Sequence, residues 1–270
     1  MHPIEHLRYV ARARNVDASD LVREAAVALG SLRTDGPNLV IACRRIVERH
    51  PEVGPLWWLC ARMLTSDDPR SMAWTVADEL ECSPAADLLA AAIPDAATVV
   101  TIGRPATAEA ALVQRADVRV LCVDAGYAAS GMLQRLERAD VECEPVAPEA
   151  LAHAVSVADL VIVEAMSASP RRVLSPIGSR VLAAVASQQQ VPVWCAIDIG
   201  RRLPAEYVDE IASRVLPAGR WDPRHDTEID ELPVELITRV AGIDGVTADV
   251  SMALRPECAM APELLRISPI

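Results

Sequence analysis

The chain has 270 residues, of which 51% are hydrophobic, and it carries a net charge of −12. All 26 of its positive residues are arginine, which excludes a Schiff-base lysine and a phosphate-loop lysine. The acidic balance argues against a nucleic-acid partner, because binding to phosphates requires clustered cations.

The seven cysteines are scattered without Cys-x-x-Cys spacing, and the five histidines show no metal-ligand spacing. We therefore expect no metal and no other cofactor. No apolar run reaches the ~20 residues that span a bilayer, so no membrane contact is expected. The first residues lack the apolar stretch of a signal peptide, which predicts a cytoplasmic protein.

Residues 1–95 are predicted to form an N-terminal subdomain that is entirely helical. Pro37 and Pro55 suit the first turn of helices, and a capping residue precedes proline again at Asp68 and Ser83.

Two adjacent tryptophans, Trp57 and Trp58, lie in one of these predicted helices. Large aromatic side chains of this kind usually anchor a core or an interdomain contact, and this is the interpretation that we favour. The alternative is a platform on which a base or a sugar stacks.

Residues 96–270 alternate apolar runs with helical stretches, which predicts an α/β domain with a doubly wound, mostly parallel, Rossmann-like sheet. The predicted strands are Ala97–Ile102, Val118–Val123, Val141–Val146, Asp159–Ala165 and Val191–Ile197. The predicted helices are Thr107–Arg115, Ala129–Ala139, Pro148–Val155, Ile177–Gln189 and Pro204–Leu216. A loop is expected between the fourth strand and the helix that follows it.

The last part of the chain has three predicted features. Arg220–Glu231 is polar and rich in aspartate, and is predicted to be a loop. The apolar stretch Leu232–Val246 is expected to close the sheet. The tail Glu257–Ile270 is expected to reach onto a partner subunit.

The carboxyl ends of parallel strands meet at one edge of a sheet, where ligands bind. Arginines, hydroxyls and the N–H groups of the turn Gly103–Thr107 are suited to hold a phosphate there. The candidate ligand-binding residues are Arg104, Thr107, Arg171, Arg172, Ser175 and Ser179. The alternatives are a plain strand-to-helix turn and solvent-facing arginines.

Three carboxylates at the same edge are weak candidates for a catalytic base: Asp124, Glu164 and Asp198. Glu164 ends a buried strand, where an unpaired carboxylate would be costly, so the alternative is a structural ion pair with Arg104 or Arg172. Asp124 and Asp198 would hold a ribose hydroxyl or simply cap a loop. The thiols Cys122 and Cys195, both inside strands, are predicted to be inert.

Five sequence blocks, in order along the chain, resemble the initiation-factor-2B-like family. This family includes methylthioribose-1-phosphate isomerase and ribose-1,5-bisphosphate isomerase. The blocks are TVVTIGRPATAEAAL, VLCVDAGYAASGMLQRLERADVECEPV, ADLVIVEAMSA, SPIGSRVLAAVASQQQVPVWCAID and ELPVELITRVAGIDGV. The resemblance covers roughly Pro51 to Val246, and it implies the family's fold and a homodimer or larger homo-oligomer. The apolar elements near Trp57–Trp58 and at the C-terminus are expected to form the dimer surfaces.

The isomerases of this family need an acid/base pair beside the sugar and groups that hold its phosphate. The matching positions here are Gly103 for the family's Cys, Met166 for its Asp, Gly126 for its Arg and Ser175-Pro176 for its Asn-Lys. Neither glycine nor methionine can transfer a proton.

The resemblance therefore implies a non-catalytic member that senses a sugar phosphate or a nucleotide. The alternative is an aldose–ketose isomerase with a rewired site. Its base would be Glu164, Asp124 or Asp198, and Arg104 with Arg172 would clamp the phosphate.

Overall fold

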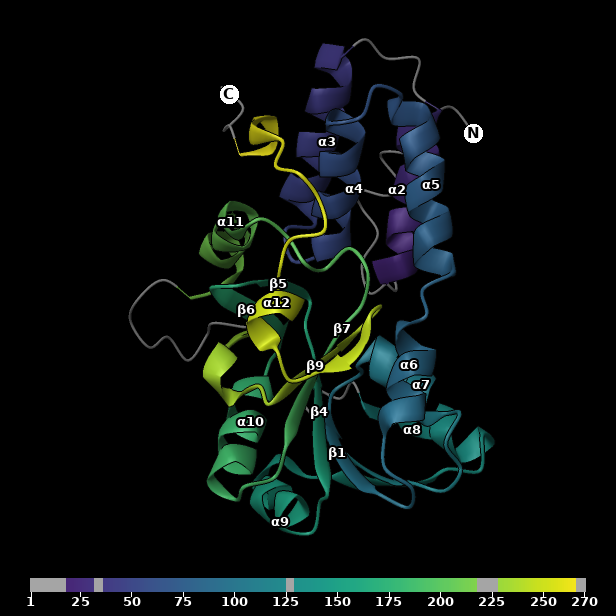
Figure 1. Cartoon of the computed structure of the whole chain (residues 1–270), viewed down its shortest axis with the longest axis vertical. Coiled ribbons are helices and arrows are strands. Elements are labelled where there is room, and N and C mark those ends of the chain that lie inside the picture. The colour runs from purple at the N-terminus through teal and green to yellow at the C-terminus, as the bar shows by residue number, and fades with distance from the viewer. Residues whose placement is uncertain (1–17, 32–35, 125–128, 218–227, 266–270) are drawn as a thin grey trace.

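The structure is a computed structural model, and it describes residues 18–31, 36–124, 129–217 and 228–265. Helices from the N-terminal part of the chain stand at one end of the molecule, and a sheet with helices on both sides forms the other end (Figure 1). The predicted mixed α/β fold is confirmed. Among the described residues, no helix is long and apolar enough to cross a membrane.

Seven strands form the main sheet in the order β10-β9-β7-β4-β1-β2-β3. Every neighbouring pair is parallel except β9 with β10. Five of the strands coincide with predicted ones, and the predicted C-terminal element closes the sheet as β9 and β10. The strands are β1 (Thr98–Ile102), β2 (Arg119–Val123), β3 (Glu142–Val146), β4 (Leu160–Glu164), β7 (Val193–Ile197), β9 (Arg239–Gly242) and β10 (Gly245–Thr247).

Helices cover both faces of this sheet, which confirms the doubly wound arrangement. One face packs on α6 (Ala85–Ala92), α7 (Ala106–Leu112) and α8 (Ala129–Arg138). The other face packs on α9 (Leu151–Ser156), α10 (Ser179–Gln188) and α12 (Val250–Ala253). Because neither face meets water, the central strands β4 and β7 are buried along their whole length.

The helical end of the molecule contains α2 (Ala18–Gly30), α3 (Gly36–Arg49), α4 (Gly54–Leu64) and α5 (Pro69–Glu81). The side chain of Asp68 caps α5 by accepting a 3.1 Å hydrogen bond from the Ser71 N–H, as the sequence pattern predicts. A later helix, α11 (Ala205–Val215), joins the same core. The predicted division at residue 95 stays a prediction, since α6 packs on the sheet and α11 on the N-terminal helices.

The tryptophan pair lies at the centre of this helical core. Trp57 is 0% exposed and Trp58 is 1% exposed, and the Trp57 ring centroid lies 5.4 Å from that of Tyr207. The interpretation as a packing anchor is therefore confirmed. Neither side chain is exposed enough to serve as a stacking platform, so that alternative is wrong. The expectation that apolar elements near this pair form a dimer surface stays a prediction.

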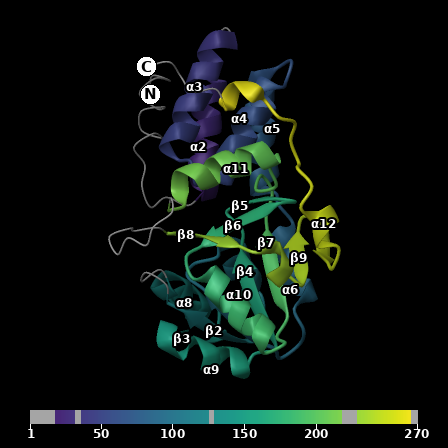
Figure 2. The ribbon, with the colours of Figure 1, turned by 90° about the vertical axis from the view of Figure 1, so that its left-hand side faces the viewer.

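A second, antiparallel sheet that the sequence did not predict connects the two ends of the molecule (Figure 2). Leu174 and Ile229 pack into the helical core, while Val173 and Leu232 pack into the core of the main sheet. The sheet replaces the loop predicted after β4 and the end of the loop predicted at Arg220–Glu231, whose residues up to 227 lie outside the described ranges. Its strands, in the order β5-β6-β8, are β5 (Ser167–Ser169), β6 (Arg172–Pro176) and β8 (Ile229–Leu232).

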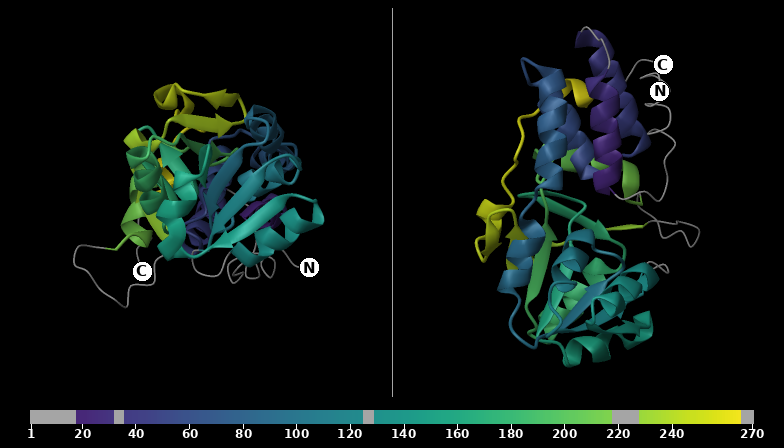
Figure 3. Two further views of the ribbon diagram at one scale, coloured as in Figure 1. Left: turned by 90° about the horizontal axis from the view of Figure 1, so that it is seen from below. Right: turned by 90° about the vertical axis from the view of Figure 1, so that its right-hand side faces the viewer.

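The C-terminal segment runs from α12 along the outside of the molecule to the helical end (Figure 3). Arg44 donates a 2.6 Å hydrogen bond from Nε to the Glu263 carbonyl. The Tyr207 hydroxyl donates to the Ala261 carbonyl at 3.0 Å and accepts from the Ala261 N–H at 2.6 Å. The described part of the tail thus packs on helices of its own chain, and residues 266–270 lie outside the described ranges. The expected contact of the tail with a partner subunit stays a prediction.

Replacing Tyr207 by Phe should lower the free energy of unfolding by about 1–3 kcal/mol, because both backbone groups of Ala261 lose a buried partner. Urea denaturation would measure the change. The matched control is Ser213→Ala, on the exposed side of the same helix, for which we expect a change within about 0.5 kcal/mol. Equal stabilities for the two variants would show that Tyr207 does not hold the segment.

Candidate functional site

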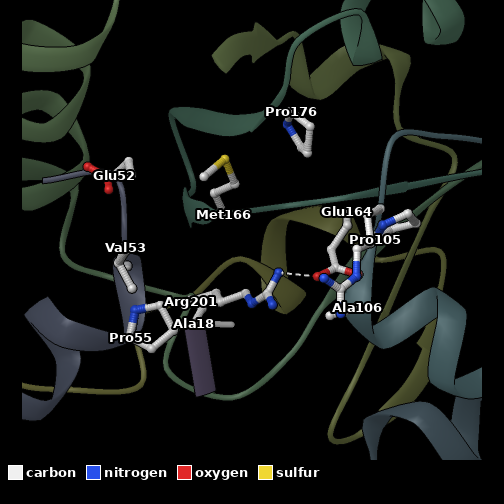
Figure 4. Close-up of a pocket in the computed structure, with 12 residues that line it drawn as sticks. Ala18, Glu52, Val53, Pro55, Pro105, Ala106, Glu164, Met166, Pro176 and Arg201 are labelled. Carbon is white, nitrogen blue, oxygen red and sulfur yellow. Dashed lines mark hydrogen bonds and ion pairs between the residues drawn. The ribbon is translucent and has the colours of Figure 1, made fainter. Parts of the chain in front are cut away.

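A pocket of about 330 Å³ lies between the helical end and the carboxyl ends of the strands (Figure 4). This volume is near the lower end of the ~300–1,000 Å³ that small-molecule sites occupy. The first turn of α4 forms one side, and the ends of β1, β4 and β7 with the loops after them form the other. The lining residues are Ala18, Glu52, Val53, Gly54, Pro55, Arg104, Pro105, Ala106, Glu164, Met166, Pro176 and Arg201.

Two glycines allow the sides of the pocket to approach each other. A Cβ atom on Gly54 would lie 2.5 Å from the carbonyl oxygen of Met166, which is closer than any side chain tolerates. Gly200 has φ of +80° in the loop after β7, and a Cβ there would lie 2.9 Å from the Trp58 ring. The start of α4 can therefore pack directly on the ends of β4 and β7.

Glu164, the last residue of β4, is the most connected polar side chain of the pocket. It is only 5% exposed. Its Oε1 accepts a 2.5 Å hydrogen bond from Nη1 of Arg201, and its Oε2 accepts from the N–H groups of Thr107 at 2.8 Å and Ala108 at 3.4 Å. Those N–H groups belong to the first turn of α7, where a negative charge is favourable. One carboxylate thus joins β4, α7 and the loop after β7.

The ion pair of Glu164 differs from the predicted one. The alternative that Glu164 forms a structural ion pair is correct, but its partner is Arg201, not Arg104 or Arg172. Sequence reasoning missed Arg201, although it follows the buried strand Val193–Ile197 at the expected edge of the sheet. Nothing in the sequence says which of several arginines at that edge reaches inward.

Arg104 is the only one of the six predicted ligand-binding residues that lines the pocket. Its side chain is 49% exposed, and its Nε lies 3.7 Å from a carboxylate oxygen of Glu109, which is also paired with Arg135. Thr107 is buried, and its N–H is already bonded to Glu164. We expected the turn at Gly103–Thr107 to offer this N–H to a phosphate. The structure shows that the N–H is instead bonded to Glu164.

Arg171 and Arg172 lie away from the pocket and link β6 to its neighbours. Arg171 is paired with Asp209 of α11 at 3.1 Å. Arg172 is paired with Glu231 of β8 at 2.8 Å and with Asp209 at 3.6 Å. The predicted clamp of Arg104 with Arg172 is therefore absent, because the second arginine holds the small sheet to α11.

Ser175 and Ser179 are completely buried and do not line the pocket. Within the described part of the chain, neither hydroxyl has a hydrogen-bond partner. The structure therefore does not bring the six predicted residues together in one site.

The two aspartates among the base candidates have capping roles. Asp198 accepts hydrogen bonds from the Ser83 hydroxyl and, at 2.7 Å, from the Ile199 N–H. Asp124 accepts from the Ala129 N–H, at the start of α8, at 3.3 Å. Neither aspartate lines the pocket, so the loop-capping alternative describes both.

The structure offers neither a reactive thiol at Cys122 or Cys195 nor, among the described residues, a metal-binding cluster. Cys122 and Cys195 are buried, and burial raises the pKa of each thiol to about 12, in line with the prediction of inert thiols. Among the residues that the structure describes, no group of three or more His, Cys, Asp and Glu side chains could hold a metal ion. Of the positions that the sequence resemblance matches to the family's functional residues, Met166 lines the pocket and Gly103 adjoins it, whereas Gly126 lies outside the described residues.

Replacing Glu164 by Ala should lower the free energy of unfolding by about 3–5 kcal/mol, because Arg201 would remain as a buried charge without its main partner. Thermal or urea denaturation would measure the loss. A double variant that also carries Arg201→Met should recover part of it. The matched control is Glu149→Ala at an exposed position, where we expect little change. If the two glutamate variants are equally stable, the pair has no structural role.

Comparison with solved structures shows the same fold in eIF-2B proteins and in a sugar-phosphate isomerase. The translation initiation factor eIF-2B of Pyrococcus horikoshii OT3 is 18% identical, with a TM-score of 0.76 over 92% of this chain and 97% of that one. A subunit of the tetrameric eIF2B-beta2-delta2 complex of Chaetomium thermophilum is also 18% identical, with a TM-score of 0.69 over 91% and 90%. The 5-methylthioribose 1-phosphate isomerase of P. horikoshii OT3 is 13% identical, with a TM-score of 0.65 over 93% and 86%. Identities this low establish the fold alone.

Among curated proteins, none matches the chain. The model of the Initiation factor 2 subunit family, IF-2B, matches residues 71–208, which is just over half of the sequence. The match includes β1, β4 and β7, whose carboxyl ends form one side of the pocket. The chain belongs to the IF-2B family, as the order of its sequence blocks predicted.

Proposed function

We propose that this chain is a non-catalytic member of the IF-2B family, which associates with copies of itself and binds a small molecule in the pocket. The observation that carries this proposal is that the Glu164 carboxylate is fully engaged by hydrogen bonds from its own chain. Both of its carboxylate oxygens accept hydrogen bonds: Oε1 from Arg201, and Oε2 from the first turn of α7. A general base must instead reach the proton that it abstracts.

The other lining residues supply no acid/base pair. The position that corresponds to the family's Asp is Met166, and Glu52 lies on the opposite side of the pocket from Glu164 (Figure 4). Proton transfer between two carbon atoms of a sugar requires both groups within hydrogen-bond reach of the same substrate. Binding makes no such demand, and the pocket is large enough for one small molecule.

An isomerase with a rewired site is the second candidate. Glu164, Arg104 and Arg201 do meet in one pocket at the carboxyl ends of the strands, which is where such folds bind ligands. For catalysis, Glu164 would have to exchange a hydrogen bond from its own chain for one to the substrate.

A turnover assay separates the two candidates. We expect the protein to form no ketose phosphate from 5-methylthioribose 1-phosphate or from ribose 1,5-bisphosphate. The reaction would be monitored by NMR in D₂O, where deuterium uptake at the sugar carbons reports proton transfer. Turnover of either substrate would overturn the proposal. A fall of about 10²-fold or more in Glu164→Gln, with Glu149→Gln unchanged, would then identify Glu164 as the general base.

Self-association is supported by the tetramer that the C. thermophilum relative forms. Analytical ultracentrifugation should give a mass that is a multiple of the chain's own. Met252 of α12, 55% exposed beside the C-terminal strands, lies where the predicted C-terminal dimer surface would be. Met252→Glu should weaken association, because it would bury a charge at that contact. Val157→Glu, at a residue that is 50% exposed after α9, is the control. A monomeric wild type, or equal effects of the two variants, would contradict this surface.

A further inference from the structure

The charges around the pocket are balanced within the described residues. Four of the twelve lining residues are ionisable, and both arginines among them have carboxylate partners: Arg201 with Glu164 and Arg104 with Glu109. With Arg135, which shares Glu109, the group has equal numbers of positive and negative side chains. Its members are Glu52, Arg104, Glu109, Arg135, Glu164 and Arg201.

Glu164 makes the contacts that an anionic ligand would otherwise seek. Its carboxylate accepts from a guanidinium that is only 11% exposed and from a backbone N–H at the edge of the sheet. Guanidinium and backbone N–H groups are the donors that phosphate groups use in proteins. The Glu164 carboxylate therefore occupies the donors that a ligand's phosphate would otherwise use.

A phosphate ester entering this pocket would add up to two negative charges beside Glu164 and Glu52. Among the described residues it would meet no buried cation without a carboxylate, and a desolvated charge without a partner is costly. The rest of the lining is uncharged, since eight of the twelve residues are alanine, valine, glycine, proline or methionine.

We infer that the pocket takes a small uncharged molecule and rejects phosphate esters, and that Glu164 is the residue that sets this preference. The inference rests on the proposed function only in taking this pocket as the ligand site. It departs from the sugar phosphate or nucleotide that the family resemblance implies.

The first experiment compares ligands that differ only in a phosphate. Adenosine and AMP, ribose and ribose 5-phosphate, and inorganic phosphate would be titrated into the wild-type protein by calorimetry and thermal shift. We expect no saturable binding of inorganic phosphate, and binding of each unphosphorylated molecule at least as tight as that of its phosphorylated counterpart. Tighter wild-type binding of AMP, ribose 5-phosphate or phosphate would overturn the inference.

The second experiment removes the internal anion. Glu164→Gln keeps the shape of the side chain and an acceptor for the Thr107 N–H, but removes the negative charge that is paired with Arg201. Inorganic phosphate should then bind about tenfold or more tightly than to the wild type, the gain expected from one charge-assisted hydrogen bond. The double variant Glu164→Gln, Arg201→Gln should lose this gain.

Glu52→Gln is the matched control, because it changes the net charge of the pocket by the same amount without releasing a buried guanidinium. An equal gain for Glu52→Gln and Glu164→Gln, or no gain for a folded Glu164→Gln, would overturn the role of Glu164. If that variant does not fold, the wild-type titrations still decide the ligand class.

The two proposals fail in distinguishable ways. Phosphate binding by the wild type without turnover contradicts the ligand class alone. Turnover of an unphosphorylated sugar contradicts the absence of catalysis alone.

Discussion

The buried ion pair between Glu164 and Arg201 fixes the geometry on which the pocket depends. A carboxylate that is 5% exposed at the end of a strand is stable only when its oxygens are bonded. Here the partners come from the first turn of α7 and from the loop after β7, so one side chain sets the positions of three elements. Residues far apart in the sequence are thereby held at one edge of the sheet.

The helical end of the molecule closes the other side of this edge through three kinds of contact. The small sheet β5-β6-β8 has one face in each core, so neither core is complete without it. Gly54 and Gly200 allow α4 to pack on the strand ends without side-chain clashes. The C-terminal segment runs back to α3 and α11 and bonds to Tyr207 and Arg44. The pocket is the space that remains between these fixed contacts.

Most of the polar residues that suggested ligand binding are paired within the fold or buried in its core. Arg171 and Arg172 join β6 to α11 and β8 through Asp209 and Glu231. Ser175 and Ser179 lie in the core, and Glu164 is engaged by its own chain. The edge of the sheet keeps the shape of a ligand site, while its charges are compensated internally. This division is the basis for proposing binding without catalysis.

The sequence by itself determined the strands of the main sheet, the helices between them and the family. Continuous apolar runs such as Leu160–Glu164 are typical of central strands covered on both sides, and capping residues such as Asp68 mark helix starts through local hydrogen bonds. Only the tertiary structure decided that β6 pairs with β8 and that Glu164 forms its ion pair with Arg201. Short polar strands and ion pairs depend on partners tens of residues away, and the choice among several arginines of equal chemistry is made by distance and burial, which periodicity does not encode.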